Sequence, residues 1–451
     1  MIDTHAHLNL NNFDKDLPEV IQRAIDNGVE YIIVPGIDLD SSIKAVDIAN
    51  KYNNVYAAVG FHPEDADKFN DQSVNALIDL SKNNKVVAIG EIGLDYYWKN
   101  VPKETQIRVF KQQLDLSLKL NLPVIIHNRE SDNEMLNIIK SYKNTPLKAQ
   151  FHCFSGDLNM AIELIKMHHF ISFTANITFP NAKNLVELVK HIQIDDLLLE
   201  TDSPFMAPQG HRGKRNEPSF VLEVAKKISE IQNIKLEDVI RTTSTNAYRL
   251  FKIGKEPQLV YTYKIGDSLY INVTNRCNAD CIFCDRKGEA IISGYKLKMP
   301  KNLEPPAETY IKEIGDPKQY KEIVFCGYGE PTIRWDVVKE IAKYVKDNGG
   351  KTRMNTNGHG NIINKRDITP ELKNLIDTIS ISLNSVYPDE YSNLMKVPES
   401  YHSEMIEFAK KAKNYTNVVM SVVGLPEVDL EKAKDLIENQ IGVKFRLREL
   451  F

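Results

Sequence analysis

Short hydrophobic runs alternate with amphipathic helical patterns through the first half of the chain. Eight runs have the length and composition of buried strands, and helical patterns lie between them. The predicted strands are residues 2–7, 31–36, 55–62, 86–91, 123–127, 149–153, 170–174 and 197–201. Eight strand–helix repeats in about 250 residues are typical of a TIM (β/α)8 barrel. We therefore expect an α/β domain of this kind over residues 1–253.

A second alternation follows a polar stretch at residues 254–261, which we expect to be a linker. The predicted strands here are residues 269–274, 322–326, 351–356, 378–383, 418–423 and 443–447. Six strand–helix repeats in this length predict a partial, open (β/α)6 barrel over residues 262–451. A chain of 451 residues is also too long for one ordinary hydrophobic core, which favours two domains.

Composition narrows the class of protein without indicating its chemistry. A hydrophobic content of 42% and a charged content of 26% are typical of globular proteins. The net charge of −4 excludes a global basic surface, so any recognition of phosphate has to be local. The first residues do not have the pattern of a signal peptide, and no run approaches the ~18 apolar residues of a membrane span. We expect a cytoplasmic protein that does not bind membranes.

Six potential metal ligands each stand at the downstream end of a predicted strand in the first domain. They are His5, His7, Glu91, His127, His152 and Asp202. A parallel barrel gathers these strand ends on one face, so the six side chains should converge. His5 and His7 are two residues apart on one predicted strand, and their rings should point the same way. A single histidine after an apolar run is usually an ordinary core or surface residue, but six such positions together favour a metal site.

These ligands suit two divalent metal ions, whether Mg²⁺, Mn²⁺ or Zn²⁺. The two carboxylate oxygens of Glu91 can bridge ions about 3.5–4 Å apart. Asp202 can hold a metal or accept a proton from metal-bound water, whose pKa falls to near neutrality. We therefore predict that Glu91 and Asp202 are catalytic residues as well as ligands.

The segments around these residues carry a family resemblance. They are residues 3–7, 60–63, 90–96, 127–129, 152–156, 200–204 and 210–218. Over residues 1–253 they closely resemble the TatD family of metal-dependent deoxyribonucleases. The resemblance implies a TIM-barrel phosphodiesterase with one to three divalent ions that cuts DNA, often from the 3′ end. Carried over to this chain, one metal site is formed by His5, His7, Glu91 and Asp202, and the second by Glu91, His127 and His152.

The same resemblance places His62 at a metal or at the phosphate of a DNA or nucleotide substrate. Arg212, Lys214 and Arg215 follow the last predicted strand of the barrel. They could form a solvated loop, but their place beyond the active face favours contact with a phosphodiester. The aromatic residues 96–98 either stack on a base or pack against the barrel, and both interpretations stay open.

Three of the five cysteines cluster after the first predicted strand of the second domain. They are Cys277, Cys281 and Cys284, and no nearby fourth thiolate completes a tetrahedral zinc site. Iron–sulfur clusters usually take four cysteines, so three would leave one iron of a [4Fe–4S] cluster open to an outside ligand. Cys326, at the end of another predicted strand, is a less favoured fourth ligand. This use of cysteine also suits a reducing compartment.

From about residue 262 onward, the cysteine spacing resembles the radical S-adenosylmethionine superfamily. The resemblance implies that Cys277, Cys281 and Cys284 hold a [4Fe–4S] cluster. Its open iron would bind S-adenosylmethionine, and an electron from a donor such as flavodoxin or ferredoxin would cleave that cofactor. Phe283 matches an aromatic position that shields the cluster.

Further positions match the part of the superfamily that binds S-adenosylmethionine. Gly329, Glu330 and Pro331 resemble a glycine-rich acidic motif that holds the ammonium group of the cofactor. Ser382 and Asn384 stand where the ribose and carboxylate are often bound, although turn and capping roles are nearly as common for such residues. The short form of this domain looks like those linked to TatD nucleases, whose substrate is undefined.

The leading hypothesis is therefore a bifunctional enzyme, a hydrolase acting on phosphodiester bonds joined to a radical domain of unknown substrate. An alternative is a metal-dependent amidohydrolase that acts on a C–N bond. Such enzymes commonly bridge two metals with a carbamylated lysine, whereas Glu91 fills the bridging position here. A third interpretation makes one of the two domains a scaffold without activity.

Overall fold

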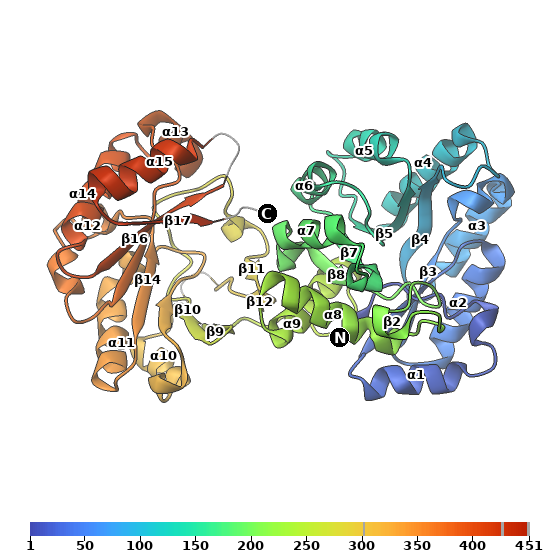
Figure 1. The fold of residues 1–451 in the computed structure, drawn as a ribbon, viewed down its shortest axis with the longest axis horizontal. Coiled ribbons are helices and arrows are strands. Elements are labelled where there is room, and N and C mark those ends of the chain that lie inside the picture. The colour runs from blue at the N-terminus through green and yellow to red at the C-terminus, as the bar shows by residue number, and fades with distance from the viewer. Residues whose placement is uncertain (301–302, 425–427, 449–451) are drawn as a thin grey trace. The chain divides into compact units, whose positions relative to one another are not determined.

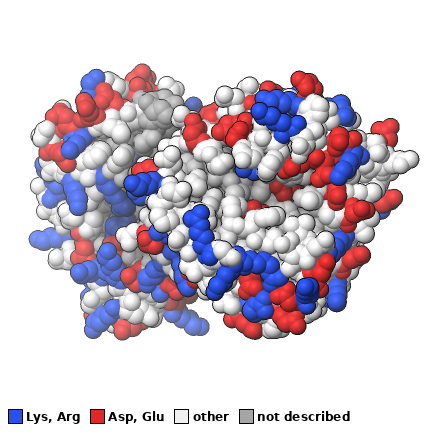
Figure 2. Space-filling model, turned by 45° about the vertical axis from the view of Figure 1, so that its right-hand side comes forward, with Lys and Arg blue, Asp and Glu red and all other residues white. Residues whose placement is uncertain are grey.

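The computed structural model describes residues 1–300, 303–424 and 428–448. The chain divides into two compact units, Met1–Glu256 and the residues from Pro257 onward. Figure 1 shows the first unit in blue to green and the second in yellow to red. In the described ranges, no helix has both the length and the apolar character needed to cross a membrane. Figure 2 shows acidic and basic side chains interspersed over the visible face, in keeping with the small net charge of −4.

The first unit is a parallel barrel whose eight strands are neighbours in chain order. The strands are β1 (Ile2–Asp3), β2 (Tyr31–Pro35), β3 (Val55–Val59), β4 (Val86–Asp95), β5 (Val124–Arg129), β6 (Ala149–Phe151), β7 (Phe170–Phe173) and β8 (Leu197–Leu199). The helices are α1 (Leu17–Asp26), α2 (Leu39–Lys51), α3 (Asp71–Leu80), α4 (Lys103–Leu120), α5 (Asp132–Ser141), α6 (Leu158–Lys166), α7 (Lys183–His191), α8 (Val221–Gln232) and α9 (Leu236–Phe251). The predicted TIM barrel is confirmed (Figure 1).

The first and last strands meet through backbone hydrogen bonds beyond their regular parts. The amide of Thr4 donates to the carbonyl of Leu199 at 3.0 Å, and the amide of His7 donates to that of Ser203 at 2.8 Å. The regular part of β1 ends at Asp3, earlier than predicted, because the following residues pair with the segment after β8. These bonds nearly close the barrel.

The interior of the barrel is apolar at its N-terminal end. Ile33, Ala58, Ile125 and Leu198 come from four strands and form one buried cluster with Phe251 at the end of α9. Their strand neighbours pack instead against the surrounding helices, as the alternation of side chains along a strand requires. Because this end is filled, polar side chains can gather at the opposite, C-terminal end of the strands.

The second unit contains a sheet in the order β17-β16-β15-β14-β13-β10-β9. Its strands are β9 (Thr262–Ile265), β10 (Ser268–Ile271), β13 (Ile323–Phe325), β14 (Thr352–Thr356), β15 (Thr378–Ser382), β16 (Asn417–Val423) and β17 (Lys444–Arg448). A separate hairpin joins β11 (Ile291–Ile292) to β12 (Tyr295–Lys296). The helices are α10 (Ala307–Ile314), α11 (Trp335–Asp347), α12 (Gly360–Asn364), α13 (Pro388–Met395), α14 (Ser400–Ala412) and α15 (Leu430–Asp435).

Six of these strands are parallel and correspond to the six predicted, so the partial barrel is confirmed. The sequence did not predict β9, which pairs antiparallel with β10 at the edge of the sheet. The turn between them includes Gly266 at a φ of 58°, a conformation that glycine adopts without strain. A four-residue strand with two polar positions gives too weak an alternation to stand out from a linker.

Candidate metal centre and cysteine loop

Glu91 lies on β4 and faces two groups of side chains with its two carboxylate oxygens. Its Oε2 lies 3.3 Å from Nε2 of His5 and 3.4 Å from Nε2 of His7. Its Oε1 lies 2.8 Å from Nε2 of His152 and 3.0 Å from Nδ1 of His127. The structure thus brings together side chains from the ends of several strands, with the carboxylate of Glu91 between the two groups.

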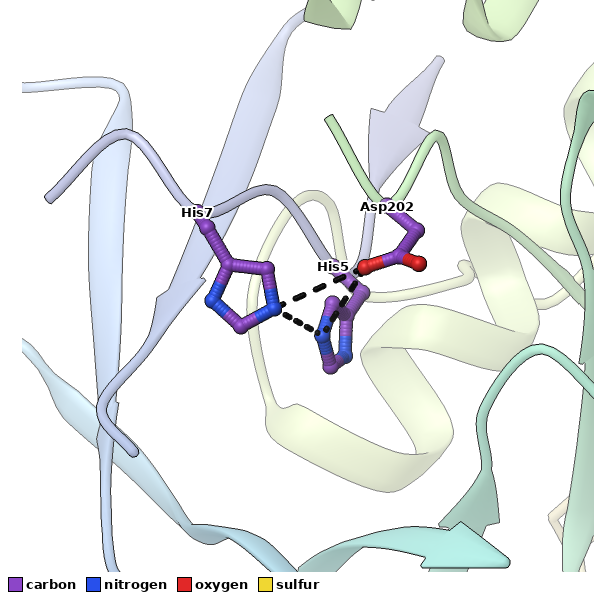
Figure 3. Close-up of side chains that lie close together, drawn as sticks. All are labelled: His5, His7 and Asp202. Carbon is purple, nitrogen blue, oxygen red and sulfur yellow. Dashed lines mark hydrogen bonds and ion pairs between the residues drawn. The ribbon is translucent and has the colours of Figure 1, made fainter. Parts of the chain in front are cut away.

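The first group consists of His5, His7 and Asp202, which point toward one another in Figure 3. The Nε2 atoms of the two rings are 3.1 Å apart, and Oδ1 of Asp202 lies 3.7 Å from His5 and 3.5 Å from His7. Neighbouring ligands of a tetrahedral ion with bonds of about 2.0–2.1 Å stand roughly 3.3 Å apart. With Oε2 of Glu91, these atoms therefore have the spacing of a metal coordination shell.

The second group consists of His127 and His152 with Oε1 of Glu91. Nδ1 of His127 and Nε2 of His152 are 3.3 Å apart. Nε2 of His62 lies nearby, 3.6 Å from Oε1 of Glu91. The Nδ1 of His62 accepts a hydrogen bond from the amide of Glu64, which assigns the proton of the neutral ring to Nε2. His62 therefore presents a donor to the site, which suits a phosphate oxygen better than a metal.

The two carboxylates, His5 and His62 have the charge states that suit a metal site, whereas, against the effect of burial, hydrogen bonds and nearby carboxylates raise the pKa of His127 and His152. Burial opposes ionisation of Glu91, but the surrounding imidazoles hold its pKa well below the ordinary value. Burial opposes ionisation of Asp202 as well, and the hydrogen bond to His7 lowers its pKa. Burial lowers the pKa of His5 to about 4 and that of His62 to about 3, so both rings are neutral. Ionised carboxylates and neutral imidazoles are the forms that coordinate divalent ions.

The pKa of His7 reflects the position of its ring between two carboxylates. Burial by itself would lower its pKa, but hydrogen bonds to Asp202 and Glu91 raise it to about 10. The proton on this ring is therefore held between two carboxylates, where a metal ion would displace it. The Nδ1 atoms of His5 and His152 are buried and have no hydrogen-bond partner among the residues that the structure describes. The residues present fit a pair of divalent ions.

Two buried carboxylates behind the ligands were not singled out by the sequence analysis. Oδ2 of Asp95 lies 2.9 Å from Nε2 of His127 and turns the Nδ1 of that ring toward the centre. Glu200 accepts a hydrogen bond from the amide of Cys153 at 2.5 Å and lies 4.0 Å from Nδ1 of His152. Asp95 follows Glu91 by four positions on β4, so the alternation of the strand could have indicated that both side chains share a face.

A pocket of about 760 Å³ opens over the centre. It is lined by His7, Leu10, Ile37, His62, Glu64, Asp65, Glu91, Trp98, His127, Asn128, Arg129, His152, Cys153, Ser155, Asn176, Asp202, Phe205 and Met206. Of these described lining residues, Arg129 alone is lysine or arginine. Arg129 belongs to the segment 127–129 that carries the family resemblance, but its place in the pocket is shown only by the structure.

The aromatic residues after β4 divide between the two roles that the sequence left open. Tyr96 packs against the hydrophobic core of the barrel. Tyr97 and Trp98 are each 47% exposed, and Trp98 lines the pocket. The guanidinium of Arg129 lies 3.9 Å from the centre of the Tyr97 ring, which holds the cation at the rim.

The predicted basic cluster lies outside the pocket lining. Arg215 forms a bidentate ion pair with Asp16, with distances of 2.8 and 2.6 Å. The guanidinium of Arg212 lies 4.7 Å from the centre of the Phe179 ring, and Lys214 is exposed. The pair with Asp16 ties the loop after β8 to the segment before α1. Contact of these basic residues with a substrate stays a prediction, and the structure gives Arg215 a structural partner instead.

In the second unit, Cys277, Cys281 and Cys284 lie in the loop that follows β10. Sγ of Cys281 is 3.4 Å from Sδ of Met395, and Phe283 packs with two of the cysteines against the hydrophobic core. Burial raises the pKa of Cys281 to about 12, and the neighbouring cysteines add to the rise. Three thiolates together therefore need a cationic partner, which the iron of a cluster would supply. The residues fit such a group.

The acidic motif after β13 contacts this loop through the backbone, where the amide of Glu330 donates to the carbonyl of Arg276 at 2.9 Å. The carboxylate of Glu330 accepts two hydrogen bonds from Thr332, one from the hydroxyl of Thr356 and one from the amide of Asn357. Three of these donors reach Oε1 and one reaches Oε2, so Oε2 can still accept a further hydrogen bond. The contact between Glu330 and a cofactor ammonium stays a prediction. Pro331, which is buried, follows it.

The other predicted cofactor-binding residues lie at the ends of the later strands. The side-chain oxygens of Ser382 and Asn384 accept hydrogen bonds from Arg448, at 3.2 and 3.4 Å. Cys326 accepts a hydrogen bond from the amide of Asn355, with Nδ2 and Sγ 3.3 Å apart. A role for Arg448 was not foreseen, since arginine on a final strand carries no recognisable motif.

Comparison with known proteins identifies both parts of the chain. A family model described as TatD related DNase matches residues 2–252, more than half of the 451 residues. A model of the radical SAM superfamily matches residues 271–439.

Relatives of the first unit are metal-dependent hydrolases. The uncharacterized metal-dependent hydrolase YabD of Bacillus subtilis is 44% identical over 254 residues, which cover 56% of this chain and 100% of that protein. YcfH of Escherichia coli, described in the same words, is 33% identical over 256 residues, covering 56% and 96%. The crystal structure of YJJV, a TatD homolog from Escherichia coli, has a TM-score of 0.54 at 31% identity and covers 56% of this chain and 98% of its own. The chain therefore belongs to the TatD related DNase family, and a radical S-adenosylmethionine domain follows its hydrolase barrel.

Proposed function

We propose that the first unit is a deoxyribonuclease that hydrolyses phosphodiester bonds with two divalent ions, Mg²⁺, Mn²⁺ or Zn²⁺. One observation carries this proposal: the two carboxylate oxygens of Glu91 face two separate groups of ligands. When bound, the ions supply Lewis acidity and a water molecule of lowered pKa. Glu91 would contribute one carboxylate oxygen to each ligand group. This carboxylate bridge favours phosphodiesters over the C–N bonds of the amidohydrolase alternative.

The residues around the centre would transfer the proton and bind the substrate. Asp202 is ionised and accepts the proton that the attacking water loses. His62 donates from Nε2 to an oxygen of the phosphate, and Arg129 at the rim balances its charge. Trp98 offers an exposed ring on which a base can stack.

The dimensions of the pocket support cleavage at a strand end. A pocket of about 760 Å³ is of the size that holds small ligands, not a length of duplex. We propose exonuclease cleavage from the 3′ end of single-stranded DNA.

The test is cleavage of a single-stranded oligonucleotide labelled at either end, by the full chain with each of the three metals. We expect shortening from the 3′ end and a loss of ~100-fold or more for Asp202→Asn. Asparagine is chosen because Asp202 has a φ of 55°, which asparagine tolerates better than alanine. Asp79→Asn, on the exposed side of α3, is the matched control. Full activity in Asp202→Asn, or hydrolysis of cyclic amides without cleavage of DNA, would contradict the proposal.

We propose that the second unit binds a [4Fe–4S] cluster and S-adenosylmethionine and acts on a separate substrate. The clustered thiols of Cys277, Cys281 and Cys284 support this assignment. A flavodoxin or ferredoxin in the cytoplasm would supply the electron. Anaerobically reconstituted protein should contain iron and acid-labile sulfide, and release 5′-deoxyadenosine with a reductant. Cys281→Ala should lose both properties, while Cys153→Ala in the first unit should keep them. Absence of iron from the unaltered protein would end the proposal.

A further inference from the structure

The sheet of the second unit has one apolar face and one polar face. On β17, Phe445 packs against the hydrophobic core that the helices cover. Lys444, Arg446 and Arg448 alternate with it, so their side chains belong to the opposite, inner face. None of these three cations forms an ion pair with a residue in the described parts of the chain. The inner face of β17 therefore carries three positive charges that have no anionic partner within residues 1–300, 303–424 and 428–448.

The strands beside β17 add neutral polar groups to the same face. Ser421 on β16 is the register partner of Arg446. Arg448 donates to the side chains of Ser382 and Asn384. Arg353 on β14 offers a contrast, because it is paired with Glu322 at 3.0 Å. Among the described residues, the cations without an ion pair that were named above therefore lie on β17, whereas the one on β14 is paired.

A short path of contacts joins Arg448 to the cysteine loop. Nη2 of Arg448 lies 3.4 Å from Oδ1 of Asn384, whose Nδ2 lies 3.0 Å from Sδ of Met395. Sγ of Cys281 lies 3.4 Å from the same sulfur atom. Two side chains, those of Asn384 and Met395, therefore separate Arg448 from Cys281.

We propose that Lys444, Arg446 and Arg448 bind the phosphate group of a phosphorylated small molecule, which is the substrate of the radical domain. This inference rests on the proposed function of the second unit. The three cations extend over about 13 Å of strand, which exceeds the reach of a single carboxylate. A phosphate carries more than one charge and accepts bidentate bonds from arginine. The carboxylate of S-adenosylmethionine is a weaker candidate, because the superfamily resemblance places it on iron.

The chemistry of the first unit supplies this class of molecule. Water adds to phosphorus, one P–O bond breaks, and the diester becomes a phosphomonoester and an alcohol. Hydrolysis of DNA at its end therefore releases a mononucleotide, which carries the group that the β17 face would bind. Thymidine 5′-monophosphate is accordingly the probe of choice.

The experiment is calorimetric titration of the full chain, with its cluster and without added divalent metal. We expect thymidine 5′-monophosphate to bind at least roughly tenfold more tightly than thymidine, since only the former offers charge-assisted acceptors. Arg448→Gln should weaken the nucleotide by ~10-fold and leave thymidine unchanged. Arg448→Lys should recover part of the loss. Lys434→Gln removes an exposed charge from α15 and serves as the matched control. Because all variants lie in the second unit, any binding at the first unit is the same in every titration and is fitted as a separate, unchanged site.

Further titrations distinguish a site for inorganic phosphate from a site for a nucleotide. Inorganic phosphate binding as tightly as the nucleotide would support a site for phosphate alone, and weaker binding would support recognition of the nucleoside as well. Equal nucleotide affinity in the unaltered protein and in a variant with both Arg446→Gln and Arg448→Gln would overturn the proposal. So would a loss of S-adenosylmethionine binding without a loss of nucleotide binding. If no cluster assembles, the titration on cluster-free protein still tests the face independently of the radical function.

Discussion

Asp95 accepts a hydrogen bond from Nε2 of His127, and this bond of 2.9 Å determines which nitrogen of the ring faces Glu91. The pair is a carboxylate–histidine arrangement of the kind that orients metal ligands. Asp95→Asn replaces the carboxylate with a neutral amide, whose NH2 group cannot accept the hydrogen bond from Nε2 of His127. We expect the affinity of the second metal group to fall by ~10–100-fold. Titration with Mn²⁺ or Zn²⁺ checks this, with Asp79→Asn as the control, and unchanged affinity would refute a positioning role for Asp95.

The two carboxylate oxygens of Glu91 face different ligand groups, so two variants should retain different amounts of metal. Asp202→Asn removes a ligand from the first group only, so the protein should keep close to one ion per chain. Glu91→Gln removes the residue shared by both groups, so both ions should bind more weakly. Elemental analysis after gel filtration checks the ratio. Equal metal content in the two variants would show that Glu91 does not bridge.

Arg129 at the rim should affect substrate binding without affecting metal binding. Arg129→Gln removes the one lysine or arginine among the described residues that line the pocket. We expect KM for a single-stranded oligonucleotide to rise by ~10-fold, with metal content unchanged. Arg108→Gln, on the exposed side of α4, is the control. A fall in metal content would instead indicate that Arg129 supports the centre indirectly.

His169 should make the stability of the first unit depend on pH. Burial, and then the neighbouring His168, lower its pKa from 6.5 to about 4. Below pH 6.5 the unfolded chain binds a proton that the folded protein does not, so stability falls as the pH drops from 6.5 toward 4. The shift corresponds to about 3 kcal/mol at full effect. Unfolding by urea across this range should show a shallower decline for His169→Leu than for the unaltered protein, and His191→Gln should resemble the latter.

Gly329 should be intolerant of any side chain. A Cβ atom there would stand 2.2 Å from the carbonyl oxygen of Thr274 and 2.7 Å from that of Arg276. Since both contacts are with backbone, Gly329→Ala should cost roughly 1–3 kcal/mol and reduce iron incorporation. At Gly424 the nearest atom would be 3.6 Å away, so Gly424→Ala is a suitable control. Normal iron content and unfolding temperature in Gly329→Ala would contradict this close packing.

The sequence predicted the barrel and the convergence of its ligands because both follow from strand order. His5, Glu91 and Asp202 stand at strand ends, and a parallel barrel brings such ends together regardless of detail. The contacts of Asp95 and Arg215 could not be predicted in this way. They depend on side-chain direction and on which loop lies beside which helix. Neither produces a repeating pattern of hydrophobic and polar residues in the sequence.

The second unit shows the same limit. Alternating apolar positions indicated its six parallel strands. The edge strand β9 was missed, because a short, half-polar strand resembles a linker in sequence. Strand β17 was predicted, but the sequence did not show that its cations have no ion-pair partner among the described residues. Glu330 was recognised by its motif, but only the structure shows that Thr332, Thr356 and Asn357 donate hydrogen bonds to it.

The hydrogen bond from Thr4 to Leu199 joins residues that are 195 positions apart. During synthesis, His5 and His7 leave the ribosome long before the segment that completes their surroundings. A complete first ligand group, which includes Asp202, therefore forms only after the eighth strand has emerged and docked. Ion uptake by newly made protein would mark the end of maturation of the first unit.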